Sequence, residues 1–274
     1  MASCTTCYDR SPPSLGIEPL IWGLTPISDI GKLGFDPELV RALSDARHIC
    51  VLTGAGISAE SGVPTFRDAQ DGLWAQYDPL QLATPEAFEE NPSLIWQWYR
   101  WRRKLVAEAQ PNPGHRALAR LAELVPRFTL VTQNVDGLHQ RAGNTEVIEF
   151  HGNLFDDRCW VEGCSVEAAG TADVPLCPQC GANLRPGVVW FGEAIPEDAL
   201  NRSFAAAADC DVFLSVGTSS LVYPAAGLGD IAQESGAVVA EINPQPTLRS
   251  QAYDFSISAN AGAALPKLVE LLVA

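Results

Sequence analysis

The sequence predicts an α/β fold, in which a Rossmann-like parallel sheet domain carries a small metal-held module and a helical insertion. Short apolar strands alternate with helical stretches, which is typical of a parallel sheet covered on both faces. Small polar residues follow several of these strands, so we expect a ligand crevice along the carboxyl edge of the sheet. Four cysteines with the spacing of metal ligands interrupt the pattern and indicate the module.

The individual elements follow from local patterns. Asp36 and Pro37 predict a helix start, and this helix runs to about Ala46. Apolar strands are expected at residues 48–53, 128–132, 211–216, 237–242 and 255–258. Helices are expected at residues 115–124 and 196–208. Residues 1–34 are rich in Pro, Gly and Ser and predict an N-terminal arm, in which Cys4 and Cys7 are two free thiols.

These patterns divide the chain into an arm and one main domain, residues 35–274. The Rossmann-like part is expected at 35–62, 114–152 and 194–274. The helical insertion is expected at 63–113 and the metal-held module at 153–193, where Cys, Gly and Pro are frequent.

Composition restricts the class of protein. Among 274 residues 47% are hydrophobic, which is ample for a buried core. The net charge of -15 argues against direct binding to nucleic acid or anionic membranes, although it favours basic peptide segments. No apolar run approaches the roughly 18 residues of a membrane span, and no secretory signal precedes the domain. We therefore expect a cytoplasmic protein, whose eight cysteines are metal ligands and spare thiols.

The first strand runs directly into Gly54-Ala55-Gly56. The first glycine permits a tight turn, and the second lets backbone N–H groups approach a phosphate at a helix start. The third position of the motif is Ala59, and no acidic residue ends a strand about 20 residues later. Both departures argue against an ordinary NAD dehydrogenase.

Four histidines occur, and one stands out as a candidate base. His48 begins a strand, His115 begins a helix and His139 falls in a helical stretch, so all three are expected to be structural. His151 follows an apolar run and precedes a glycine. With an ordinary pKa near 6.5 it can accept a proton at neutral pH. Gln133, Asn134 and Asp136 end the strand at 128–132, either as a helix cap and turn or as part of a site.

The cysteine spacing predicts a zinc site. Cys159-x4-Cys164 and Cys177-x2-Cys180 supply four thiolates. Four sulfur ligands satisfy tetrahedral zinc and leave no open position, so we expect one structural zinc per chain. Cys50 and Cys210 lie in or near strands and are expected to be buried thiols.

Along the chain the order is GAGISAESGVPTFR at 54–67, QNVD at 133–136, His151 and then the four cysteines. This order resembles the sirtuins, the NAD-consuming protein-lysine deacylases, over about residues 35–274. The resemblance implies that His151 is the catalytic base and that Asn134 and Asp136 are also catalytic, lining the nicotinamide–ribose pocket together with Gln133. It implies that nicotinamide and acyl-ADP-ribose are the products. It also implies NAD contacts from Gly54, Ala55, Gly56, Ser58, Phe66, Arg67, Gln133, Asn134, Asp136, Gly217, Thr218, Ser219, Asn243 and Ala261.

A tryptophan-rich helix is expected from Asn91-Pro92 to about Ala107. Its apolar stripe contains Leu94, Trp98, Trp101 and Leu105. Arg100, Arg103 and Lys104 fall away from the stripe and are expected to be solvated. Tyr99 and Arg102 flank the stripe, so Arg102 is expected to be partly buried. Without further context Arg102 is a snorkelling arginine.

The string WYRWRR resembles the Tyr-x-x-Arg signature of class III sirtuins, the branch that removes acidic acyl groups. Ala83 matches their enlarged acyl pocket, and Thr65 occurs in the same branch. A guanidinium and a phenol suit the distal carboxylate of a succinyl- or malonyl-lysine. Val189 and Phe191 are expected to pair with the substrate backbone as an added strand, although a simple buried strand is the alternative.

The leading hypothesis is an NAD-dependent desuccinylase and demalonylase with weaker deacetylase activity. The expected partners are acyl-lysine-bearing proteins, with no direct nucleic-acid or membrane contact, and the expected state is a monomer. Two alternatives stay open: NAD hydrolysis or ADP-ribosyl transfer on the same fold, and a non-catalytic NAD-binding regulator.

Overall fold

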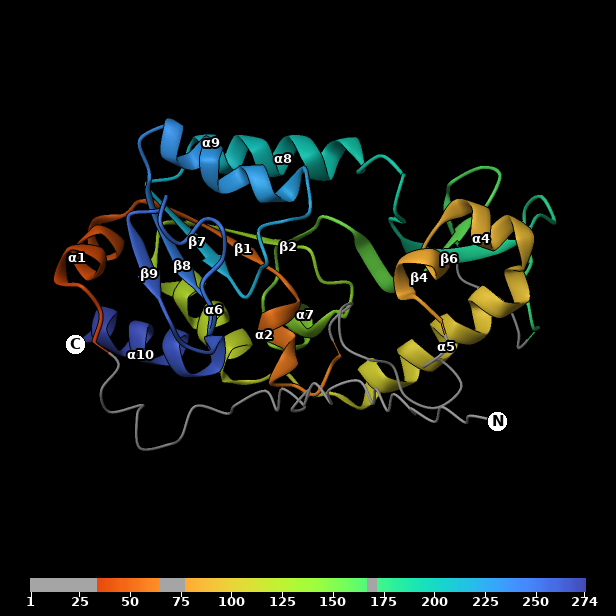
Figure 1. Cartoon of the computed structure of the whole chain (residues 1–274), viewed down its shortest axis with the longest axis horizontal. Helices are drawn as coiled ribbons and strands as arrows, with labels where there is room; N and C mark the ends of the chain where they lie inside the picture. Colours follow the sequence, from red (N-terminus) through yellow and green to blue (C-terminus); the bar gives the residue numbers. More distant parts are fainter. Residues whose placement is uncertain (1–33, 65–76, 167–171) are drawn as a thin grey trace, which may run out of the picture.

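The structure is a computed structural model that describes residues 34–64, 77–166 and 172–274 (Figure 1). The predictions for the arm at 1–33, for Cys4 and Cys7, and for Thr65, Phe66 and Arg67 lie outside the described residues.

A six-stranded parallel sheet forms the larger part of the molecule, in the order β3-β2-β1-β7-β8-β9. Five of the strands match the predicted ones closely, and the short strand β3 was not predicted. The order reverses between β1 and β7, so the helices that follow these two strands lie on opposite faces of the sheet at a topological switch point. The bounds are β1 His48–Thr53, β2 Arg127–Thr132, β3 Val147–Glu149, β7 Val212–Val216, β8 Val238–Ile242 and β9 Phe255–Ile257.

Helices cover both faces of this sheet. Along β1, Ile49 and Val51 point into one core cluster and Cys50 and Leu52 into another, as the two-residue period of a strand requires. The first cluster lies under α1 Pro37–Asp45, α6 Pro113–Leu124 and α10 Ala261–Val273. The second lies under α8 Glu197–Ala208, the 3₁₀ turn η3 Ala225–Gly227 and α9 Leu228–Glu234, on the opposite side of the sheet in Figure 1.

A smaller part lies at one end of the sheet in Figure 1. It contains an antiparallel sheet in the order β5-β4-β6, with β4 Gly152–Cys159, β5 Ser165–Val166 and β6 Leu184–Val188. It also contains α3 Pro79–Leu82, α4 Pro85–Glu90 and α5 Pro92–Glu108. One core cluster joins the strands to the helices, so the two predicted insertions pack against each other.

This packing corrects one prediction for α5. Arg103 is not solvated: its side chain is 21% exposed, Nε donates to the Leu154 carbonyl at 2.7 Å, and Nη2 pairs with Asp157 at 2.7 Å. The face of α5 that carries Arg103 would be exposed to solvent in an isolated helix, but in this fold it packs against β4. Lys104 is exposed and Arg102 is half-buried, both as predicted.

Two short helices follow strands of the large sheet. Helix α2 Ala55–Ala59 follows β1, and α7 Leu138–Arg141 follows β2. Among the described residues no helix has the length and apolar character needed to cross a membrane.

Candidate active site

The two glycine-rich loops touch at the carboxyl edge of the large sheet. The Gly56 N–H donates to the Gly217 carbonyl at 2.8 Å. A Cβ on Gly56 would lie 2.7 Å from that oxygen, and one on Gly54 would lie 2.8 Å from Thr218 Cα. Gly217 also has a positive φ of 59°. Close approach of the loops after β1 and β7 therefore requires these glycines, in addition to any role beside a phosphate.

Amide side chains bridge the loops that follow β1, β2 and β7. The Gln133 Nε2 atom donates to Thr218 Oγ1 at 2.9 Å. The Asn134 Nδ2 atom donates to the Gly54 carbonyl at 3.0 Å and to Ser58 Oγ at 3.1 Å. From β8, Asn243 Nδ2 donates to the Thr218 carbonyl at 2.8 Å. The sequence predicted one ligand site from four separate segments, and the structure brings residues of all four segments together.

Ser58 is the centre of a buried network. Its hydroxyl donates to Asp136 Oδ2 at 2.7 Å and accepts from Asn134. The other carboxylate oxygen, Oδ1, accepts the Leu138 N–H at 2.9 Å. Burial raises the pKa of Asp136, and these hydrogen bonds oppose the rise.

Two further histidines join this network. The Asn112 N–H donates to His115 Nδ1 at 3.4 Å, so His115 directs its Nε2–H toward Ser58 Oγ, also at 3.4 Å. His139 Nε2 lies 2.9 Å from Thr53 Oγ1, which itself donates to Thr132 Oγ1. Both imidazoles are buried, as expected for structural histidines. Their proximity to the site was not predicted, because it depends on the packing of α6 and α7.

The burial of these histidines keeps them neutral. Desolvation lowers the pKa of His115 to about 4 and that of His139 to about 3. The charge of Arg116 lowers the pKa of His115 further, and His115, whose ring centroid lies 4.8 Å from that of His139, lowers the pKa of His139 further. They can therefore orient hydroxyl groups but do not titrate near neutral pH.

His151 has the geometry of a base. Its Nδ1 lies 3.1 Å from the Gln133 carbonyl, which can only accept, so the proton is on Nδ1 and the lone pair is on Nε2. Burial lowers the pKa of His151, and the Gln133 hydrogen bond opposes the shift. The imidazole is therefore neutral at pH 7 and can accept a proton at Nε2.

The predicted acyl residues lie next to one another. The Phe191 N–H donates to the Ala83 carbonyl at 2.9 Å, and the Val189 N–H donates to the His151 carbonyl at 2.8 Å. The Phe191 side chain is 44% exposed. Between these two residues, Trp190 Nε1 donates to the Tyr99 hydroxyl at 2.8 Å. Trp190 was missed in the sequence, although it stands between two predicted residues.

Tyr99 and Arg102 lie one turn apart on α5, where Tyr99 is buried and Arg102 is half-buried. Tyr99 is 2% exposed, and burial raises its pKa to about 12, so the phenol keeps a proton that it can donate. Burial lowers the pKa of Arg102, while the electrostatic influence of Tyr99 and Asp136 raises it. Asp136 belongs to the loop after β2, so the charge of that loop acts on Arg102.

Three of the four predicted zinc ligands converge. The sulfur atoms of Cys159, Cys177 and Cys180 lie within 4.8 Å of one another. Cys164 lies on the adjoining turn, where its carbonyl accepts the Cys159 N–H at 2.9 Å and its Sγ is 3.9 Å from Gln179 Oε1. Three converging thiols and a fourth one turn away are a donor set that fits tetrahedral zinc.

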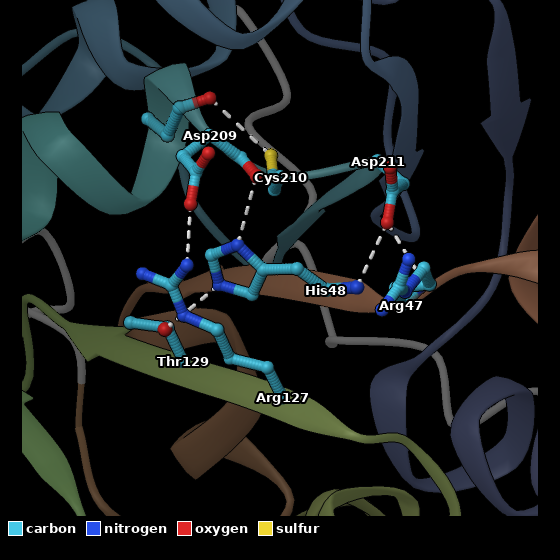
Figure 2. A network of polar contacts seen from close by, with 8 residues as sticks. Arg47, His48, Arg127, Thr129, Asp209, Cys210 and Asp211 are labelled. Atoms are coloured by element: carbon cyan, nitrogen blue, oxygen red, sulfur yellow. Dashed lines mark hydrogen bonds and ion pairs between the residues drawn. The ribbon is translucent and has the colours of Figure 1, made fainter.

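The amino edge of the sheet carries a separate structural network, shown in Figure 2. His48 Nδ1 contacts the Asp209 carbonyl and Nε2 contacts Thr129 Oγ1, both at 3.0 Å. Asp211 Oδ2 accepts the backbone N–H groups of Arg47 and His48 at 2.8 Å. His48 is thus structural, as predicted. Cys50 and Cys210 are buried thiols, also as predicted.

Comparison with known proteins decides the family. The Sir2 family profile matches residues 54–224. The NAD-dependent protein deacylase of Ralstonia nicotianae is 52% identical over 249 residues, which cover 89% of this chain and 99% of that protein. This chain belongs to the Sir2 family.

Other Sir2 proteins agree in sequence and fold. NAD-dependent protein deacylase 1 of Pseudomonas aeruginosa is 49% identical over 84% of this chain and 96% of its own length. A solved Sir2 homolog–NAD complex has a TM-score of 0.83 at 43% identity, covering 88% of this chain and 94% of that one. A Sir2 protein bound to an acetylated peptide has a TM-score of 0.75 at 30% identity, covering 85% and 96%.

Proposed function

We propose that this Sir2 family member is an NAD-dependent protein-lysine deacylase that prefers succinyl and malonyl groups and removes acetyl groups more weakly. The deacylase part rests on family membership and on relatives that match the chain over nearly their whole length. The acyl preference rests on the residues around Tyr99 and Arg102.

The observation that carries the catalytic proposal is the tautomer of His151. The Gln133 carbonyl holds the Nδ1 proton, so Nε2 is free to accept one. NAD, when bound, supplies the ribose that receives the acyl group, with release of nicotinamide. His151 accepts a hydroxyl proton at Nε2, and its lowered pKa keeps it in the neutral form that this step needs.

The loop residues have orienting roles in this proposal. Asn134 and Asp136 form hydrogen bonds with Ser58, which hold their polar atoms in place, and they would orient the ribose and nicotinamide of NAD. The Gly54–Gly56 and Gly217–Ser219 loops, with Ser58, Gln133, Asn243 and Ala261, would hold NAD along the carboxyl edge of the sheet. The four cysteines would hold one zinc whose role is structural, since four thiolates leave it no open position.

The acidic-acyl preference follows from charge and burial. Tyr99 accepts a hydrogen bond from Trp190 and keeps its own proton to donate. Arg102 lies one turn along the same helix, is half-buried and has a planar guanidinium that suits a carboxylate. A succinyl or malonyl group would bring the negative charge that such an arginine favours, whereas an acetyl group would not.

The substrate backbone would lie against residues 189–191. Val189 bonds to His151 and Phe191 bonds to Ala83, so this segment connects the proposed base with the proposed acyl pocket. The N–H groups of Val189 and Phe191 are engaged within the chain, so an acyl-lysine peptide added here would pair with carbonyl groups of this segment and present its side chain to both sites. Three other points stay predictions: the cytoplasmic location, the monomeric state, and the division of the chain at residues 35, 63, 114, 153 and 194.

The test against simple NAD hydrolysis or ADP-ribosyl transfer is the dependence of nicotinamide release on acyl-lysine. We expect release from NAD to require a succinyl-lysine peptide and to match lysine production one for one. His151→Tyr should abolish both while NAD binding, measured by calorimetry, is largely retained. Release that is equally fast without the peptide would contradict the deacylase assignment.

A further inference from the structure

A cleft of about 370 Å³ in the smaller part of the molecule has no role in the chemistry above. It is lined by Arg158, Arg185 and Glu193 together with Trp160 and the Val188–Val189 segment. Two arginines and one glutamate give it a surplus of one positive charge, in a chain whose net charge is -15. An isolated basic cleft on an acidic protein requires its own explanation.

The two arginines lie directly across from each other. Arg158 on β4 pairs in register with Arg185 on β6, so both side chains are on one face of the antiparallel sheet. Like charges at directly opposed positions are destabilising. An arrangement that retains this repulsion needs negative charge nearby.

Glu193 supplies that charge to Arg185. The guanidinium of Arg185 pairs with both oxygens of Glu193, and Nη2 also donates to the Val188 carbonyl at 2.9 Å. It further stacks 3.5 Å from the Trp190 ring centroid. Burial would raise the pKa of Glu193, but the hydrogen bonds from Arg185 and the Trp190 N–H hold it below its ordinary value. Glu193 is therefore an anion already engaged by Arg185.

Arg158 lies within the electrostatic influence of Glu193 but, unlike Arg185, forms no ion pair or hydrogen bond with it in the described part of the chain. Its Nε is buried and has no hydrogen-bond acceptor in the described part of the chain. A buried donor without an acceptor is costly, and such groups are rare in folded proteins. A ligand that carries an oxyanion would bring negative charge to the Arg158 guanidinium from the cleft and offset the repulsion between the arginines.

The position of the cleft indicates which anion would bind. Val189 lines the cleft and donates its N–H to the carbonyl of His151, the proposed base. Phe191, two residues later, bonds to Ala83 of the proposed acyl pocket. A peptide lying along 189–191 would thus pass the mouth of the cleft, close enough to place a neighbouring side chain in it.

We propose that Arg158 forms a subsite for an aspartate or glutamate that flanks the acyl-lysine in the target protein. This inference rests on the proposed function and deepens it, since it names a feature of the substrate. A carboxylate would accept from the Arg158 guanidinium and complete its hydrogen bonding. The enzyme would then recognise two carboxylates of its substrate: one on the acyl group, and one on a side chain that flanks the acyl-lysine.

The test is a set of succinyl-lysine peptides in which one glutamate is moved through the flanking positions, each matched with a glutamine peptide. We expect glutamate at one position to raise kcat/KM roughly tenfold over glutamine, mainly through KM. Arg158→Gln should remove this preference and leave the glutamine peptides unchanged. Arg41→Gln, which removes an exposed arginine on α1, is the matched control and should keep it.

Thermal melting separates this role from a structural one. Because Arg158→Gln relieves the cross-strand repulsion, its Tm should equal or exceed that of the parent protein. Two results would overturn the subsite. In one, Arg158→Gln lowers kcat/KM equally for all peptides and also lowers the Tm. In the other, Arg158→Gln keeps the preference for the glutamate peptide. Peptide affinity, measured by fluorescence anisotropy, also shows whether Arg158 causes the preference for glutamate. This readout works even if no peptide is deacylated, and the absence of deacylation would count against the proposed function alone.

Discussion

Two buried histidines couple the candidate active site to pH. His115 and His139 have pKa values of about 4 and about 3 in the folded chain, against about 6.5 in an unfolded one. Between the folded-state and unfolded-state pKa values, the unfolded chain binds more protons than the folded chain. The free energy of unfolding must therefore fall as pH decreases. The slope is at most about 1.4 kcal/mol per pH unit for each histidine.

Urea unfolding between pH 7 and about pH 5 measures this dependence. Asp136, whose pKa is raised by burial, acts in the opposite direction, so a variant is needed to isolate the histidine contribution. His139→Asn should lower stability at pH 7 yet show a shallower loss toward pH 5. The same slope in the variant and the parent protein would show that His139 is not buried in its neutral form.

Single residues were predictable where the chemistry is local. His151 could be selected because it is followed by glycine and matches a known context, and the structure places its Nδ1 on a backbone carbonyl. Arg103 was predicted wrongly, since its partner Asp157 lies 54 residues further along the chain. Helical periodicity gives the face of a side chain but not what lies opposite that face.

At the scale of elements, metal is expected to hold the turns of the zinc module together. Strand β4 has eight residues, but β6 has five and β5 only two. The three converging thiols join the turns at Cys159 and at Cys177–Cys180. A structural metal contributes its binding free energy to folding, so its loss should affect this module first.

Replacing Cys177 with Ser should release zinc and lower the Tm, because only three of the four thiols remain. Cys210→Ser, at a buried cysteine outside the cluster, is the control and should retain the metal. Metal analysis combined with thermal melting gives both readouts. One zinc per chain and an unchanged Tm in Cys177→Ser would reject the site.

At the scale of the whole molecule, the sheet was the most predictable feature. Buried parallel strands are continuously apolar, so residues 48–53 and 212–216 could be found without knowledge of their neighbours. The three-residue strand β3 was missed, whereas the equally short β9 was predicted as part of residues 255–258. The contact between α5 and β4 was also missed, since nothing local in either segment specifies the other.

The same distinction applies to the site. Segments that end strands of one parallel sheet must meet at its carboxyl edge, so Gly54, Asn134, Gly217 and Asn243 could be brought together from sequence. Trp190 and His115 could not, because their contacts with Tyr99 and Ser58 depend on how separate elements pack. Long-range packing therefore limits what the sequence alone reveals about the acyl pocket.

The central claim is that Tyr99 and Arg102 direct this Sir2 enzyme to acidic acyl groups. The measurement that tests it is the ratio of kcat/KM for succinyl- and acetyl-lysine forms of one peptide, in the parent protein and in Arg102→Met. We expect the parent ratio to favour succinyl and the variant to lose it roughly 10- to 100-fold, mainly through KM, because one charge-assisted hydrogen bond is removed. Acetyl turnover should hold or rise, and Tyr99→Phe should act more mildly in the same direction. A parent protein that prefers acetyl-lysine, or a variant in which both substrates fall by the same factor, would contradict the claim.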